Sequence, residues 1–226
     1  KTFNSLEGAL KKIEPEYVVI ANETSEHYFA LKTILDYDVP QVLVEKPLFS
    51  SLKSFPKPLK SKVCVAYNLR FHPLLQQLRL EIEEQSVLSV QLYVGQYLPN
   101  WRPQQDYRTS YSISRVQGGG VLRDLSHELD YLNWLFGPWK ALTAIGGHYS
   151  SLAGNSDDVF CLLLEMELCP AVVLQMNYLD RSSRREILIN TDHHTFHLDF
   201  LKQEFSKDQK PTSLFLSEID DTYCAQ

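Results

Sequence analysis

Residues 118–131 read GGGVLRDLSHELDY, a stretch that joins a glycine run to the start of a helix. Three consecutive glycines remove side chains and permit unusual backbone angles, so another group can approach the main chain closely. Apolar residues then recur at gaps of three and four between residues 122 and 136, which predicts one apolar stripe of an α-helix. At about 100° per residue, Asp124, His127 and Tyr131 would cluster on the opposite face. We therefore predict a helix that presents a carboxylate, an imidazole and a phenol away from the core.

The segment before residue 73 carries the pattern of a parallel α/β layer. Continuous apolar runs are typical of strands covered on both faces, and they lie at 17–21, 42–44 and 63–67. Helical patterns surround them at 5–13, 25–36 and 73–84, the last leading out of the layer. This order is a β-α-β unit with one further strand, which indicates an α/β architecture.

Polar side chains follow each of these predicted strands. The residues from Asn22 to His27 follow the first, Glu45 and Lys46 the second, and the residues from Asn68 to His72 the third. In parallel sheets, ligands bind beyond the carboxyl ends of the strands. Three such loops at one sheet edge therefore predict a site there.

From residue 87 the pattern changes to that of an antiparallel or mixed sheet. Segments that alternate or read as strands lie at 87–94, 140–149, 158–168, 171–179, 184–191 and 194–201. A run of strands with one helix indicates an α+β domain with a large, mostly antiparallel sheet. We therefore predict two domains, at 1–72 and 73–226.

A loop rich in aromatic residues and arginine precedes the glycine run. It contains Trp101, Arg102, Tyr107 and Arg108. Arginine can bind a carboxylate or phosphate through paired hydrogen bonds. We expect this loop to border the predicted site, which would suit an acidic or nucleotide-bearing sugar. The alternative is a loop that packs against the outside of the sheet.

Composition excludes several classes of partner. The formal charge of −6 and the pI near 5.6 argue against nucleic acid, because phosphate neutralisation needs a basic surface. No apolar run reaches the roughly 20 residues needed to span a membrane. The four cysteines are scattered, without a C-x-x-C pair, which favours a reducing, cytoplasmic protein.

A second polar cluster could suggest a metal site. Asp192, His193, His194 and His197 lie close together in sequence. The cluster falls at a predicted hairpin, where alternate residues point to opposite faces, so we expect no metal there.

Several motifs in combination resemble the Gfo/Idh/MocA family of NAD(P)-dependent oxidoreductases. They are Glu45-Lys46-Pro47, followed further along the chain by Gly119-Gly120, Asp124, His127 and Asp130. The stretches 18–27 and 67–73 also match, and the resemblance runs from about residue 1 to residue 222. The segments 99–112 and 125–131 are similar to members found in nucleotide-sugar and nonulosonic acid pathways.

The resemblance implies a fold and an activity. It implies the remainder of a Rossmann domain that binds NAD or NADP, joined to a domain whose large open sheet usually forms the oligomer contact. It also implies that Lys46 and His127 are the catalytic pair, with Asp124 orienting the substrate or the histidine. From the strand-end loops we assign cofactor binding to Asn22, Thr24, His27, Glu45, Lys46 and Asn68. Substrate binding is assigned to Arg70, Trp101, Arg102, Tyr107, Arg108 and Tyr131.

The sequence departs from the family pattern in two ways. It contains no G-x-G-x-x-G turn, which in the family binds the pyrophosphate and would precede residue 1. Asp124 and His127 are three residues apart where the family usually has four, although both spacings keep a pair on one helix face. The chain therefore reads as an internal piece of a longer protein, and we expect it to bind dinucleotide poorly on its own.

We interpret the sequence as that of an oxidoreductase that transfers a hydride between NAD(P) and a hydroxyl or carbonyl carbon of a sugar or sugar derivative. In this interpretation His127, with a pKa near neutrality, is the general acid or base, and Lys46 donates a hydrogen bond to the substrate oxygen. Two alternatives remain. One is a non-catalytic module that binds a sugar or a protein and uses the sheet as a dimer interface. The other is an NAD-dependent glycosidase.

Overall fold

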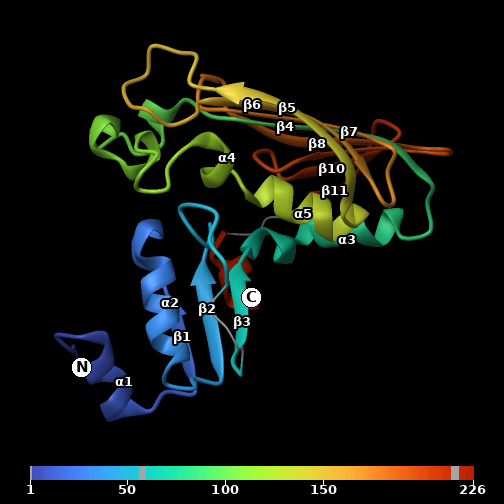
Figure 1. Ribbon diagram of the computed structural model, residues 1–226. Helices are drawn as coiled ribbons and strands as arrows, with labels where there is room; N and C mark the ends of the chain where they lie inside the picture. Colours follow the sequence, from blue (N-terminus) through green and yellow to red (C-terminus); the bar gives the residue numbers. More distant parts are fainter. Residues whose placement is uncertain (1, 56–59, 215–218) are drawn as a thin grey trace.

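The structure is a computed structural model that describes residues 2–55, 60–214 and 219–226, and it contains two β-sheets with helices between them (Figure 1). The small sheet is parallel and has the order β1-β2-β3, with β1 at Tyr17–Ile20, β2 at Gln41–Glu45 and β3 at Lys62–Ala66. The large sheet has eight strands in the order β11-β10-β9-β8-β4-β7-β6-β5. This arrangement confirms the predicted fold class, a parallel α/β layer followed by a large, mostly antiparallel sheet.

Two helices cover one face of the small sheet. They are α1 (Leu6–Ile13), where the Ser5 hydroxyl accepts a hydrogen bond from Gly8, and α2 (His27–Leu35), which follows the 3-10 helix η1 (Thr24–Glu26). Their buried side chains form one apolar cluster with β1 and β2, made of Leu10, Ile20, Leu31, Ile34, Val39, Val42 and Val44. Because this cluster lies on one side only, the prediction that the first strand is covered on both faces is wrong. Tyr17 and Val19 are 52% and 51% exposed.

The large sheet confirms the predicted strands and adds two. Its predicted members are β4 (Val87–Gly95), β5 (Trp139–Gly147), β6 (Val159–Met166), β7 (Ala171–Asn177), β8 (Arg184–Thr191) and β9 (Thr195–Asp199). The hairpin of β10 (Glu204–Lys207) and β11 (Lys210–Leu214) was not predicted, because the segment is polar and carries no marked alternation. The pairing of β4 with β7 is parallel and the other pairings are antiparallel.

The helices that cover the inner face of this sheet are α3 (Pro73–Ile82), α4 (Val121–Asp124) and α5 (His127–Phe136). The single helix predicted after the glycine run is therefore two helices, interrupted at Leu125 and Ser126. Figure 1 shows α4 and α5 lying between the two sheets, and none of the residues of α5 is classed as exposed. The prediction that Asp124 and Tyr131 point away from the core is wrong, since they are only 4% and 1% exposed.

The C-terminal helix α6 (Ile219–Ala225) returns to the small sheet and packs on the 3-10 helix η2 (Asn68–Phe71), as Figure 1 shows near the label C. The remaining 3-10 helices, η3 (Leu98–Asn100), η4 (Tyr107–Thr109) and η5 (Tyr111–Ile113), lie in the aromatic–arginine loop. The domain boundary near residue 72 stays a prediction. In the described ranges no helix has the length and apolar character to cross a membrane.

Candidate active site

The carboxyl end of β2 meets the start of α4 and α5. Lys46 directly follows β2, its peptide bond to Pro47 is cis, and its Nζ donates a hydrogen bond to the backbone carbonyl oxygen of Asp124 at 2.5 Å. Burial lowers the pKa of the Lys46 ammonium, and the charge of Arg185 lowers it further. The carboxylates of Asp124, Glu128 and Glu45 oppose this effect. The lysine is therefore a half-buried cation at the contact between the two sheets.

The Asp124 carboxylate lies in a group of tyrosines. Its Oδ2 accepts a hydrogen bond from the Tyr178 hydroxyl at 2.6 Å, and Tyr178 comes directly after β7. Burial, followed by the negative charge of Asp124, raises the pKa of both Tyr178 and Tyr111. The other oxygen, Oδ1, is buried and has no hydrogen-bond partner among the residues that the structure describes. Asp124 is thus enclosed by Tyr178 and Tyr111.

His127 begins α5 and faces the small sheet. Its ring meets the ring of Tyr67 edge to face, with centroids 5.6 Å apart, and its Nδ1 is buried without a hydrogen-bond partner in the described part of the chain. Burial, the positive charge of Arg185 and that of Lys46 together lower the pKa of His127 to about 2. The expectation of a pKa near neutrality is therefore wrong for this arrangement. At this pKa the imidazole is neutral, so its unpartnered Nδ1 can accept a hydrogen bond beside the Lys46 ammonium, which can donate one.

The glycine run lets three segments meet at this point. Gly118 has a φ of 90°, and a Cβ on it would lie 3.0 Å from both Thr24 and Ser50. A Cβ on Gly119 would lie 2.1 Å from the carbonyl oxygen of Tyr111, so only glycine fits there. Beyond the run, Asp157 caps α4 by accepting a hydrogen bond from the Leu122 amide through its carboxylate.

His27 connects the loops that follow β1 and β2. Its Nδ1 lies 3.1 Å from the carbonyl oxygen of Pro47, and its Nε2 lies 3.1 Å from that of Asn22. The ring is buried, so its role in this arrangement is to hold the two loops together. Thr24 is also buried and packs against Gly118, while Glu45 accepts a weak hydrogen bond from the Lys46 amide.

Three predicted binding residues are engaged with other parts of the protein. Asn68 is buried and donates a hydrogen bond to Thr222 of α6 at 2.7 Å. Arg70 forms a two-point ion pair with Asp130, at 2.7 Å and 2.6 Å. Tyr131 is fully buried, and its hydroxyl donates to Glu128. Because burial leaves Tyr131 no surface for a substrate, the assignment of Tyr131 to substrate binding is withdrawn.

The aromatic–arginine loop divides into two parts. Trp101 meets the Tyr178 ring edge to face at 5.2 Å, and the positive charge of Arg102 opposes the rise in the pKa of Tyr111. These two residues therefore lie beside the tyrosines that surround Asp124. Arg108 is exposed, pairs with Asp106 at 3.7 Å and covers the ring of Tyr107.

Sequence reasoning missed several residues of this region. Tyr67, Tyr111 and Tyr178 line it, and Glu128 and Arg185 form a two-point ion pair behind it. Tyr178 and Arg185 lie at the ends of strands far from the motifs in sequence, and no local pattern connects them to Asp124 or His127. Glu128 is next to His127, but its arginine partner could not be identified from spacing.

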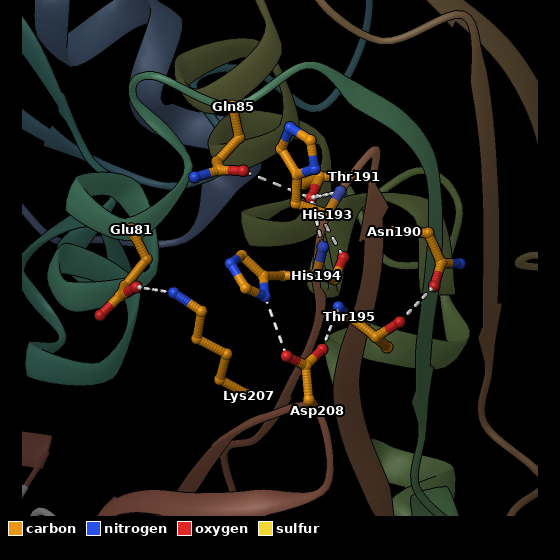
Figure 2. A network of polar contacts seen from close by, with 9 residues as sticks. All are labelled: Glu81, Gln85, Asn190, Thr191, His193, His194, Thr195, Lys207 and Asp208. Carbon is orange, nitrogen blue, oxygen red and sulfur yellow. Dashed lines mark hydrogen bonds and ion pairs between the residues drawn. The ribbon is translucent and has the colours of Figure 1, made fainter.

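The histidine cluster forms a separate polar network, shown in Figure 2. His194 pairs with Asp208 at 2.8 Å, and the other oxygen of Asp208 accepts a hydrogen bond from the Thr195 amide. This network joins the β8–β9 turn to the β10–β11 turn. His197 approaches Glu186 at 3.4 Å. Among the described residues, no group of three or more His, Cys, Asp or Glu side chains could hold a metal ion.

Comparisons with known proteins agree with this architecture. The family model of the GFO/IDH/MocA C-terminal domain matches residues 76–197. An uncharacterised oxidoreductase of Synechocystis sp. is 30% identical over 151 residues, which cover 63% of this chain and 40% of that protein. The chain thus spans about two fifths of the length of this curated relative.

Solved structures share the fold at low sequence identity. An oxidoreductase from Thermotoga maritima is 17% identical, with a TM-score of 0.79 over 99% of this chain and 69% of that one. The WlbA dehydrogenase from Bordetella pertussis, in complex with NADH and UDP-GlcNAcA, is 18% identical, with a TM-score of 0.74 over 100% and 66%. A levoglucosan dehydrogenase in complex with NADH and levoglucosan is 16% identical, with a TM-score of 0.76 over 93% and 62%.

Proposed function

The chain belongs to the GFO/IDH/MocA family, and we propose from this premise that it is part of an NAD(P)-dependent oxidoreductase acting on a sugar or sugar derivative. The observation that carries the proposal is the hydrogen bond from Lys46 Nζ to the Asp124 carbonyl, because it brings the lysine to the helix start that holds His127. The similarity to an oxidoreductase over 151 residues supports the same class of reaction.

In the proposed chemistry, His127 handles the proton of the substrate hydroxyl and Lys46 stabilises the negative charge on the substrate oxygen. In the oxidative direction, His127 takes the proton of the substrate hydroxyl, and in reduction it returns that proton. This role requires the bound substrate and cofactor to raise the pKa of the imidazole above its value of about 2 in the ligand-free arrangement. Lys46 donates a hydrogen bond to the same substrate oxygen and stabilises the negative charge that develops on it. Asp124 is proposed to orient the substrate or His127, with its carboxylate held by the Tyr178 hydroxyl.

NAD or NADP supplies the hydride acceptor or donor when bound. Two observations fit such a group beside this site. Asp124 and His127, which flank Lys46, each keep one buried polar atom without a hydrogen-bond partner in the described part of the chain, and the loops after β1 and β2 are held in place by His27. We propose that Asn22, Thr24, Glu45 and Lys46 line the nicotinamide side of this region, with His27 positioning them and Asn68 supporting the edge.

The substrate is proposed to carry a negative charge. Trp101 and Arg102 lie next to the tyrosines around Asp124, so the guanidinium can meet a carboxylate or phosphate of the substrate. Tyr107 and Arg108 form the outer rim of the loop, and Arg70 stiffens the opposite side through Asp130.

We further propose that the protein is cytoplasmic and forms a homo-oligomer through the outer face of the large sheet. All four cysteines are free thiols, which supports a reducing compartment. The outer face carries exposed apolar side chains on adjacent strands, namely Ile145, Leu163 and Val173. The net charge of −6 supports the absence of nucleic acid as a partner.

The test is a fluorescence titration, with NADH and NADPH, of the complete protein of which this chain is a part, followed by turnover assays on neutral and anionic sugars. We expect binding of at least one cofactor and oxidation of at least one sugar class. His127→Asn should abolish most of the turnover, and exposed His193→Asn serves as the matched control. Failure to bind either cofactor would contradict the proposal.

A further inference from the structure

Helix α5 is held from two sides by arginine–carboxylate pairs. From the large sheet, Arg185 of β8 donates to Glu128 through Nε at 2.7 Å and Nη2 at 3.1 Å. From the small sheet side, Arg70 of η2 donates to Asp130 through the same two atoms at 2.7 Å and 2.6 Å. Both pairs are two-point contacts, which fix orientation as well as distance.

The two contacts determine how α5 is rotated about its axis. Glu128 and Asp130 are separated by about 200° around a helix, so the arginines bind it from opposite sides. His127 directly precedes Glu128, and a rotation of the helix that loosened the Arg185 pair would move the imidazole away from Lys46. The Arg185 pair is also the more enclosed of the two, because the Glu128 side chain is fully buried and that of Arg185 is 22% exposed.

The same pair also affects the charge at the site. Charged or titratable groups reach Lys46 from four elements: Glu45 from β2, Asp124 from α4, Glu128 from α5 and Arg185 from β8. His127 is close enough to Lys46 to feel its charge. The ring of Tyr67, directly after β3, meets the His127 ring edge to face. Arg185 lowers the pKa of Lys46 and Glu128 raises it, so the loss of either residue alone leaves the effect of the other unopposed.

We propose that Glu128 and Arg185 are positioning residues of the Lys46–His127 site, which fix α5 against β8 and balance the charge around the lysine. The inference rests on the proposed function for its catalytic meaning. It goes beyond that proposal because it assigns a role to an ion pair that touches neither substrate nor cofactor.

Two single variants test the charge balance in opposite directions. Arg185→Met leaves the Glu128 carboxylate unpaired, which should raise the titration midpoint of Lys46. Glu128→Gln leaves the arginine unbalanced, which should lower that midpoint. The midpoint is read from the ¹³C signal of the lysine side chain, identified by its loss in Lys46→Met. Arg185→Lys keeps the charge and should leave the midpoint close to that of the wild type.

A purely structural role would not separate the two variants. If the Lys46 midpoint moves in the same direction in both, or stays unchanged in both while circular dichroism shows folded protein, the inference is overturned. If either variant fails to fold, the double variant Glu128→Gln with Arg185→Met removes both charges, and its midpoint should return toward the wild-type value. A double variant that keeps a large shift would also overturn the inference.

The activity assay then separates this inference from the proposed function. We expect kcat to fall roughly tenfold or more in both single variants, with little change in KM, because a misplaced imidazole slows proton transfer. The alkaline limb of the pH–rate profile should move up in Arg185→Met and down in Glu128→Gln. A wild-type protein without turnover on any sugar would contradict the proposed function, whereas the NMR titration would still decide the inference.

Discussion

Lys46 and Asp124, 78 positions apart in the chain, are joined by a hydrogen bond from the lysine Nζ to the aspartate backbone carbonyl. The lysine therefore uses the main chain of α4 and leaves the carboxylate of Asp124 to Tyr178. This contact links the edge of the small sheet to the helices that cover the large one. A ligand that replaces the Asp124 carbonyl as the acceptor of Lys46 Nζ would receive a hydrogen bond from a charged donor next to His127.

The first prediction concerns that lysine. Lys46→Met should lower kcat by about 10²–10⁴, the range expected for loss of a positioned acid–base group. The kcat of Lys46→Arg should also stay low, because a planar guanidinium cannot take the place of a compact ammonium in this half-buried position. Lys62→Met, at an exposed position at the start of β3, is the matched control and should turn over sugar like the wild type. Equal rates for the Lys46→Met and Lys62→Met variants would remove Lys46 from the mechanism.

The second prediction concerns pH and His72. Burial, helped by the charge of Arg185, lowers the pKa of His72 to about 4, and its Nδ1 accepts a hydrogen bond from the Leu74 amide at the start of α3. The unfolded state binds this proton more readily, since its pKa is 6.5, so the contribution to stability is complete above pH 6.5 and is lost as pH falls toward 4. His72→Asn keeps a capping acceptor without a titrating group. Denaturant unfolding should show that the stability of His72→Asn falls less steeply than that of the wild type between pH 6.5 and pH 4. The two slopes should differ by up to about 1.4 kcal/mol per pH unit.

Local patterns were sufficient to predict most of the fold. The strands from β1 to β9 and the helices α1 to α3 follow from apolar periodicity and from caps such as Ser5. The break between α4 and α5 was not predicted, because Leu125 continues the apolar stripe through it. The burial of Asp124 and Tyr131 was also missed, since a single helix pattern cannot reveal that a second sheet lies on its polar side.

The candidate site was predictable where motifs are local and unpredictable where contacts are distant. The motifs that carry Lys46, after a predicted strand, and His127, on the helix after the glycine run, are short and local, and the resemblance supplies their proposed catalytic role. Tyr178 and Arg185 act through β-strand pairing in a sheet whose order cannot be read from sequence. The same limit applies to Asn68, which a strand-end rule assigned to the cofactor and which contacts Thr222 across 154 positions.

The third prediction compares two arginines of the aromatic–arginine loop. Arg102→Ala should raise KM for an anionic sugar by roughly tenfold or more, because a lost charge-assisted hydrogen bond costs about 1.5–3 kcal/mol. Arg108→Ala should change KM much less, since this guanidinium is already paired with Asp106 and lies away from the tyrosines around Asp124 in the proposed arrangement. Steady-state kinetics with a neutral sugar provide the control, where neither variant should differ from the wild type. Equal effects of the two variants would show that the loop does not approach the substrate as proposed.

The fourth prediction concerns the attachment of α6. Thr222→Val removes the hydroxyl that accepts the Asn68 amide and leaves a buried donor without this partner, which should destabilise the protein by about 1–3 kcal/mol. Thr222→Ser keeps the hydroxyl, so this variant should lose much less stability than Thr222→Val. Thermal unfolding of the three proteins at one concentration measures the difference. If the valine and serine variants lose the same stability, the hydrogen bond is not what holds the helix.

The last prediction concerns Gly119, where the structure leaves no room for a side chain. A Cβ would lie 2.1 Å from the carbonyl oxygen of Tyr111 and 2.5 Å from that of Ser112. Both contacts are with backbone, so neither can be relieved by rotating a side chain. Gly119→Ala must displace the loop that carries Tyr111, and overpacking of this kind costs typically about 1–3 kcal/mol. Because Tyr111 lies beside Asp124, kcat should fall together with stability. Gly8→Ala is the comparison. Its Cβ would lie 2.8 Å from the Ser5 hydroxyl, so a flexible side chain has to move at the expense of the α1 cap, and turnover should stay that of the wild type. Wild-type stability and turnover in Gly119→Ala would show that the glycine run is not what brings this loop against the site.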